Sequence, residues 1–145
     1  MAVIVFPTDF SDVSVKALPW AIKMAGSANA MLHCIYVVEE PQVYTTLDMG
    51  AVAIPTTGEM VESAEKRMQV FVSQHLKNTP HGHASKVRVG HPSTEIVAYA
   101  SEVHAEMIVM TTHGYRGVKH VLLGSTAEDV LRRATCPVLT VRAQS

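Results

Sequence analysis

A short apolar run, Met107-Ile108-Val109-Met110-Thr111, leads into the turn residues Thr112-His113-Gly114. After nine intervening residues Gly124 precedes a helical pattern that begins at Ser125. An apolar run of this length, bounded by turn residues, is typical of a strand that is buried on both faces. After Ser125 the apolar residues recur at helical spacing, so we expect an inner face made of Ala127, Val130, Leu131 and Ala134. The stretch therefore predicts one strand–turn–helix unit of an α/β fold.

The same alternation runs along the rest of the chain. Four further strands are predicted, at Val3 to Phe6, Met31 to Val38, Ala84 to Val89 and Pro137 to Arg142. Helices are predicted after the first strand to about Ala25 with a kink at Pro19, from Glu59 to Leu76, and from Pro92 onward. This alternation indicates a single α/β domain over residues 1–145, with a doubly wound parallel sheet and helices on both of its faces.

Composition excludes several classes of function. Of the 145 residues, 48% are hydrophobic, the formal net charge is -1, and Lys and Arg never occur more than two in a row. A nucleic-acid surface or a polybasic membrane anchor would need a basic cluster. No apolar run reaches the roughly 20 residues of a membrane helix, and Pro7 and Asp9 interrupt the first run, so we expect a cytoplasmic protein. Cys34 and Cys136 lie in apolar runs and are expected to be buried free thiols.

The carboxyl ends of the predicted strands mark where a ligand would bind. The amides at Gly124, Ser125 and Thr126 are expected to be free donors at the positive end of the last helix, where anions bind readily. An alternative is that Ser125-Thr126-Ala127-Glu128 is only a capping box. Neither a Gly-Lys-Ser/Thr triplet nor a G-x-G-x-x-G run is present.

Three segments resemble the motifs of the universal stress protein family. They are Val5 to Ser11, Gly90 to Ile96, and the set formed by Met107 to Gly114, Gly124-Ser125 and Cys136 to Val138. The similarity covers the chain except the segment from Glu39 to Pro55, which has no clear period and is predicted to be a long loop. That loop is expected either to lie over the adenine side of a bound nucleotide or to pack against a partner subunit.

The resemblance implies a five-stranded sheet in the order 3-2-1-4-5 and a homodimer. In that order the apolar strand Val138 to Val141 lies at an open edge of the sheet, so we expect the dimer to pair through it. The resemblance also implies binding of ATP or AMP, with or without Mg²⁺. In the binding branch of the family a glycine stands where this chain has Thr111. The residues expected to bind the nucleotide are Pro7, Thr8, Asp9, Val37, Met110, Thr111, His113, Gly114, Arg116, Gly124, Ser125 and Thr126.

Several of these residues have simpler interpretations. Asp9 could be only a carboxylate near a helix N-terminus, Arg116 a solvated loop residue, and His113 either a phosphate donor or a residue that orients the turn. The close pair His81 and His83 lacks a third ligand, so no metal site is expected.

The function expected from the sequence is a nucleotide-binding stress-response regulator that is not an enzyme. No Ser/His/Asp or Cys/His set has a matching context, so nucleophilic catalysis is not indicated. Two alternatives remain. One is a slow ATPase or self-phosphorylating protein that uses Asp9 or His113 as its base, and the other is a nucleotide-free interaction module.

Overall fold

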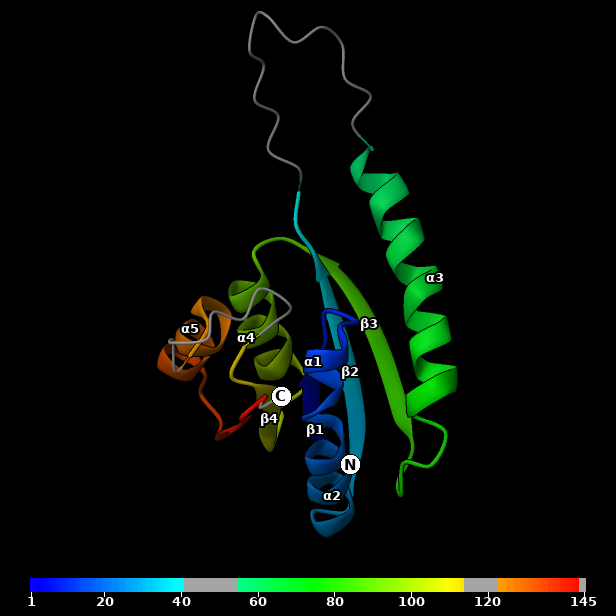
Figure 1. Cartoon of the computed structure of the whole chain (residues 1–145). Coiled ribbons are helices and arrows are strands. Elements are labelled where there is room, and N and C mark those ends of the chain that lie inside the picture. Colours follow the sequence, from blue (N-terminus) through cyan, green and yellow to red (C-terminus); the bar gives the residue numbers. More distant parts are fainter. Residues whose placement is uncertain (41–54, 114–122, 144–145) are drawn as a thin grey trace, which may run out of the picture.

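The computed structural model describes residues 1–40, 55–113 and 123–143. Its five strands form one parallel sheet in the order β3-β2-β1-β4-β5 (Figure 1). The elements are β1 (Ala2–Pro7), α1 (Asp12–Val15), α2 (Leu18–Ser27), β2 (Ala30–Val38), α3 (Thr57–His75), β3 (His83–Val89), α4 (Pro92–Glu102), β4 (Met107–Thr111), α5 (Ser125–Arg133) and β5 (Val138–Val141). The predicted fold class and strand order are confirmed.

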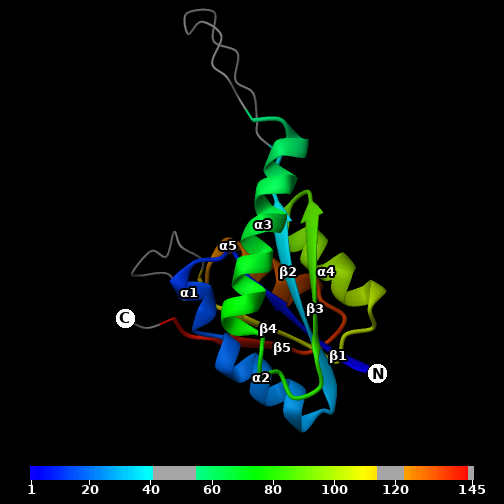
Figure 2. The same ribbon diagram turned by 90° about the vertical axis from the view of Figure 1, so that its right-hand side faces the viewer.

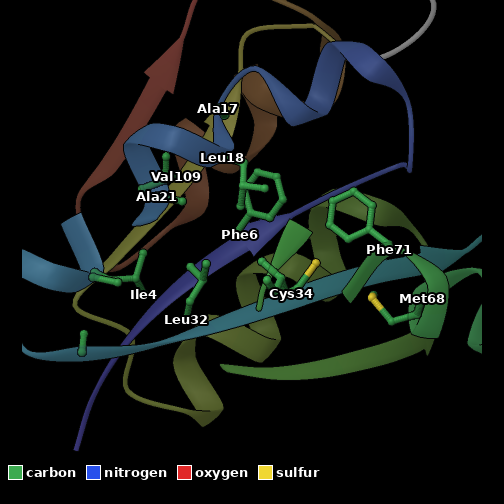
Figure 3. Packing of buried hydrophobic residues seen from close by; sticks show 13 residues of the cluster. Ile4, Phe6, Ala17, Leu18, Ala21, Leu32, Cys34, Met68, Phe71 and Val109 are labelled. Atoms are coloured by element: carbon green, nitrogen blue, oxygen red, sulfur yellow. The ribbon is translucent and has the colours of Figure 1, made fainter. Parts of the chain in front are cut away.

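The helices cover both faces of the sheet: α2 and α3 lie on one face, and α4 and α5 lie on the other (Figures 1 and 2). On the first face, side chains of α2 and α3 meet those of β1 and β2, with Phe6 and Phe71 stacked at 6.4 Å between ring centroids (Figure 3). A second cluster joins β1, β2 and β4 to α4 and α5. Because the strands point apolar side chains to both sides, one sheet supplies two cores.

Two sequence expectations on the first and last helices were wrong. The single kinked helix is instead two helices, α1 and α2, and Pro19 lies in the first turn of α2, where its missing N–H breaks no hydrogen bond. On α5 the inner face is made by Ala127 and Val130, whereas Leu131 is 40% exposed. The helix α5 packs against α4 and against β5, which is the last strand of the sheet. In the described part of the chain, no further strand lies beyond β5 to cover Leu131.

The two thiols differ in burial. Cys34 is fully buried in the first core, and that burial raises the pKa of its thiol. Cys136 is only partly buried, so the expectation of a buried thiol holds for Cys34 alone. The predicted loop from Glu39 to Pro55 lies, apart from its ends, outside the described residues.

The edge strand β3 is tied to α4 through Arg88. Its guanidinium donates to Glu102 at 2.7 and 3.0 Å and to Glu95 at 3.0 Å. These hydrogen bonds lower the pKa of Glu102 below its ordinary value. Gly90, which follows β3, donates its N–H to the Val38 carbonyl at 2.9 Å and has a φ of 149°. A Cβ at this position would lie 2.9 Å from Cγ of Glu95.

We predict opposite effects for two glycine-to-alanine changes. Gly90→Ala should lower the free energy of unfolding by about 1–3 kcal/mol, because alanine does not readily adopt this φ and would displace Glu95 from Arg88. Gly58→Ala, in the first turn of α3 with only Thr56 Oγ1 at 3.9 Å, should raise it by about 0.4–1 kcal/mol. Urea unfolding of both variants checks this, and equal effects would contradict it.

Candidate functional site

A cleft of about 920 Å³ opens at the carboxyl ends of β1, β2 and β4. The N-terminal residues of α4 and α5 form its other wall. Ten of the twelve residues expected at the site line this one cleft: Pro7, Thr8, Asp9, Val37, Met110, Thr111, His113, Gly124, Ser125 and Thr126. The other two, Gly114 and Arg116, lie outside the described residues. The cleft is therefore at the topological switch point, where β1 has β2 on one side and β4 on the other.

The β1–α1 turn is fixed by short-range hydrogen bonds. Thr8 is buried, and its hydroxyl bonds the Ser14 hydroxyl at 2.8 Å and accepts the Phe10 N–H at 3.0 Å. Asp9 Oδ1 accepts the N–H of Ser11 at 3.0 Å and also its hydroxyl. Ser11, not Asp9, is the N-cap of α1. Asp9 therefore lies beside the start of α1, bonded to the N-cap residue, as well as lining the cleft.

The turn after β4 is folded onto the start of α5. The Gly124 N–H donates to the Thr112 carbonyl at 2.6 Å, and a Cβ on Gly124 would lie 3.2 Å from that oxygen. The expectation that the Gly124 amide is a free donor was therefore wrong. The capping-box alternative was also wrong, because Gly124 itself is the N-cap and Ser125 is the first helical residue. The amides of Ser125 and Thr126, in the first helical turn, have no acceptor within the helix. An anion bound at this helix end would accept hydrogen bonds from them.

Thr111 and His113 are joined at the same turn. The Thr111 hydroxyl donates to the His113 carbonyl at 2.7 Å, so this side chain is held against the turn that it precedes. His113 Nδ1 bonds the Thr112 hydroxyl at 3.1 Å. Its other nitrogen, Nε2, is buried without a hydrogen-bond partner among the described residues. Buried polar atoms are rarely left unpaired, so the ring has one polar atom to offer to a group from outside these residues.

Twelve of the lining residues were not among those expected at the site, and three of them, Phe10, Tyr36 and Arg67, form a connected group. The Phe10 ring lies 4.4 Å from the Tyr36 ring, and the Arg67 guanidinium lies 4.8 Å from the centroid of Phe10. Phe10 has a φ of 65°, a left-handed conformation that is unusual for a bulky residue. Aromatic residues beside a strand end could have indicated Phe10 and Tyr36. No local signal marks Arg67, which lies on the exposed side of α3.

A polar cluster fixes α4 against α5 behind the cleft. Ser93 is fully buried, donates its hydroxyl to Asp129 of α5, and is bonded to His91 at 3.0 Å. Arg133 pairs with Asp129 at 3.3 Å and donates to Thr94 at 2.9 Å. Pro92 and Thr126, which line the cleft, belong to the same two helices that this cluster joins.

The described residues show neither a metal centre nor a membrane span. No group of three or more His, Cys, Asp or Glu side chains is placed to hold a metal ion within residues 1–40, 55–113 and 123–143. None of the helices in these ranges combines the length and apolar character needed to cross a bilayer.

The doubly wound sheet and the cleft at its switch point define an α/β protein of the doubly wound class, in which ligands bind at this position. The chain belongs to the Universal stress protein family, whose model matches residues 1–142. It is 35% identical to universal stress protein MJ0531 of Methanocaldococcus jannaschii, over 96% of this chain and 81% of that protein. It is 31% identical to universal stress protein YxiE of Bacillus subtilis, over 92% of this chain and 94% of that protein.

Solved structures show the same fold. The universal stress protein UspA from Lactobacillus plantarum superposes with a TM-score of 0.77 at 23% identity, over 97% of each chain. The universal stress protein from Archaeoglobus fulgidus in complex with dAMP gives 0.67 at 21% identity, over 97% of this chain and 96% of that one. A universal stress protein in complex with cAMP gives 0.62 at 24% identity, over 99% and 98%.

The cluster between α4 and α5 can be tested with two neighbouring acidic residues. Asp129→Ala should cost about 1–3 kcal/mol of unfolding free energy, because it removes the carboxylate partner of the buried Ser93 hydroxyl. Glu128→Ala removes an exposed pair with Arg132 of the same i,i+4 spacing and should cost under about 0.5 kcal/mol. Denaturant titrations give both values, and a Glu128 effect as large as that of Asp129 would refute the assignment.

Proposed function

We propose that residues 1–145 form one nucleotide-binding domain of a stress-response regulator, with ATP or AMP as its ligand, with or without Mg²⁺. The proposal rests on the difference between the two ends of the cleft, which carry different kinds of chemical group. One end holds the first-turn amides of α5 and His113 Nε2, which has no hydrogen-bond partner among the described residues, and the other holds Asp9, Val37 and aromatic side chains. Solved relatives of the same fold in complex with dAMP and with cAMP support this choice of ligand.

The nucleotide would lie across the sheet edge with its phosphates at α5. The amides of Ser125 and Thr126 would receive the phosphate oxygens, helped by the positive end of the helix. His113 Nε2, when protonated, would donate to the same group. Asp9 and Val37 would contact the adenine and ribose side, with Pro7, Thr8, Met110 and Thr111 beneath them. Gly114 and Arg116 belong to the proposed phosphate site but lie outside the described residues.

We propose that binding, not catalysis, is the function. An ATPase or self-phosphorylating protein would need a placed general base. Of the two candidates, Asp9 has Oδ1 engaged by Ser11, and His113 has Nδ1 engaged by Thr112. These bonds suit a site that orients its ligand. The bound nucleotide would then act by changing the conformation or the partners of a homodimer, and a cytoplasmic location fits such a role.

We predict that ATP or AMP at a hundred times its dissociation constant stabilises the protein by about 2.7 kcal/mol. For a chain of this size the melting temperature should rise by roughly 5–11 °C. His113→Ala should weaken binding by about tenfold or more, because it removes a donor to a charged group, whereas His81→Ala, in a turn away from the cleft, should not. Thermal scans and calorimetry measure both effects. A wild-type melting temperature unmoved by millimolar ATP and AMP would refute the proposal and favour the interaction module.

We also propose that the homodimer forms through β5. All four of its residues are half-buried, and it is an edge strand without a charged side chain. The amides of Ile108 and Thr112 donate to the carbonyls of Pro137 and Val141. In a parallel ladder this pattern leaves the N–H of Thr140 pointing away from β4, toward an added strand.

Thr140→Pro should therefore convert the dimer to a monomer while keeping the fold, because it removes an outward N–H at the sheet edge. Thr140→Val, which keeps that N–H, should stay dimeric. Light scattering at micromolar concentration distinguishes the two. A monomeric wild-type protein, or a dimeric Thr140→Pro variant, would contradict this interface.

A further inference from the structure

Arg67 is placed differently from the other basic residues of α3. It lies on the exposed side of the helix, yet its side chain reaches the cleft and its guanidinium carbon is 4.8 Å from the centroid of Phe10. Within the described part of the chain, Arg67 makes this cation–π contact with Phe10. No hydrogen bond or ion pair joins its guanidinium to another described residue. The adjacent Lys66, by contrast, pairs with Glu62 at 3.5 Å. Arg67 thus brings unused N–H donors to the cleft wall.

The surface beside Arg67 is aromatic and fixed in position. Phe10 stacks with Tyr36 at 4.4 Å and contacts the buried Phe71 at 5.8 Å between centroids. The N–H of Phe10 is held by the Thr8 hydroxyl, which stabilises its left-handed φ of 65°. Such a conformation costs about 1–3 kcal/mol and persists only where the surroundings hold it. The Phe10 ring is therefore presented at the cleft by a constrained turn.

The charges at this end select against an anion. Among the described residues that line the cleft, Asp9 and Glu39 are acidic and Arg67 is the single Lys or Arg. A phosphate bound here would be repelled by two carboxylates and attracted by one guanidinium. At the start of α5 it would meet only N–H donors, so the phosphate is favoured there. A flat heteroaromatic ring that carries both acceptors and an amino group fits better. Its face can stack on an arginine–aromatic pair, and its ring nitrogens can accept from the guanidinium.

We propose that Arg67 is a specificity-determining residue that binds the base of the nucleotide, with Phe10 and Tyr36 as the surface behind it. This inference rests on the proposed function and assigns a residue to its nucleoside end. The guanidinium donates to a ring nitrogen, and the exocyclic amino group of adenine donates toward Asp9. The chain thereby recognises a base with donor and acceptor groups side by side, in addition to its phosphates.

Calorimetric titration of ATP and of inorganic triphosphate, each into the full chain, tests the assignment. Arg67→Met keeps the length of the side chain and removes its donors and charge. It should raise the dissociation constant for ATP by about fivefold and leave that for triphosphate unchanged. Lys66→Met is the matched control on the adjacent, solvent-facing position and should change neither. Arg67→Lys keeps the charge without the planar fork and should recover only part of the ATP affinity.

The outcomes separate this inference from the function on which it rests. Equal losses for ATP and triphosphate would overturn it, because Arg67 would then be a phosphate contact. So would an Arg67→Met variant that binds ATP like the wild type. A wild-type protein that binds neither ligand would overturn the proposed function as well, whereas wild-type binding with an unaffected variant would remove the role of Arg67 alone.

Discussion

Parallel pairing of β1 with both β2 and β4 is the constraint on which the rest of this molecule depends. Parallel neighbours cannot be joined by a tight turn, so each connection must cross a face of the sheet, and here the first crossings use one face and the later ones the other. The strands reached over the first face lie on one side of β1 in the sheet, and those reached over the second face lie on its other side. The polar turns after β1 and β4 therefore meet at one edge without being neighbours in the sequence, and the cleft lies between them.

The two ends of the cleft are built by different means. At the α5 end, backbone groups provide the chemistry, and the Gly124–Thr112 hydrogen bond sets where the first helical amides lie. A Cβ on Gly124 would lie 3.2 Å from the Thr112 carbonyl oxygen, a tight contact, so the turn itself disfavours a larger residue there, whatever the ligand. At the other end, side chains from the β1–α1 turn, β2 and α3 form the wall, and their positions depend on tertiary packing around Phe10 and Phe71.

This difference explains what the sequence could and could not predict. Strands, their direction and the turn glycines follow from local patterns, and the resemblance to the family added the strand order and several of the lining residues. Errors arose where a residue's surroundings decide its role. Pro19 suits a helix start as well as a kink, and Leu131 has helical spacing but no sheet beneath it. Arg67 has the pattern of a solvated helix residue, and only the packing of α3 beside the β1–α1 turn brings it to the cleft.

The two edges of the sheet are chemically unlike, and this difference limits how copies of the chain can add to one another. β5 is made of the uncharged, half-buried residues Val138, Leu139, Thr140 and Val141, whereas β3 carries His83, Lys86 and Arg88, the last fixed to Glu95 and Glu102 of α4. A lysine on an edge strand opposes the approach of another strand. Under the proposed pairing through β5, each copy would have one edge that accepts a partner strand and one that does not. An assembly built by strand addition would then close at a pair and would not grow into a filament.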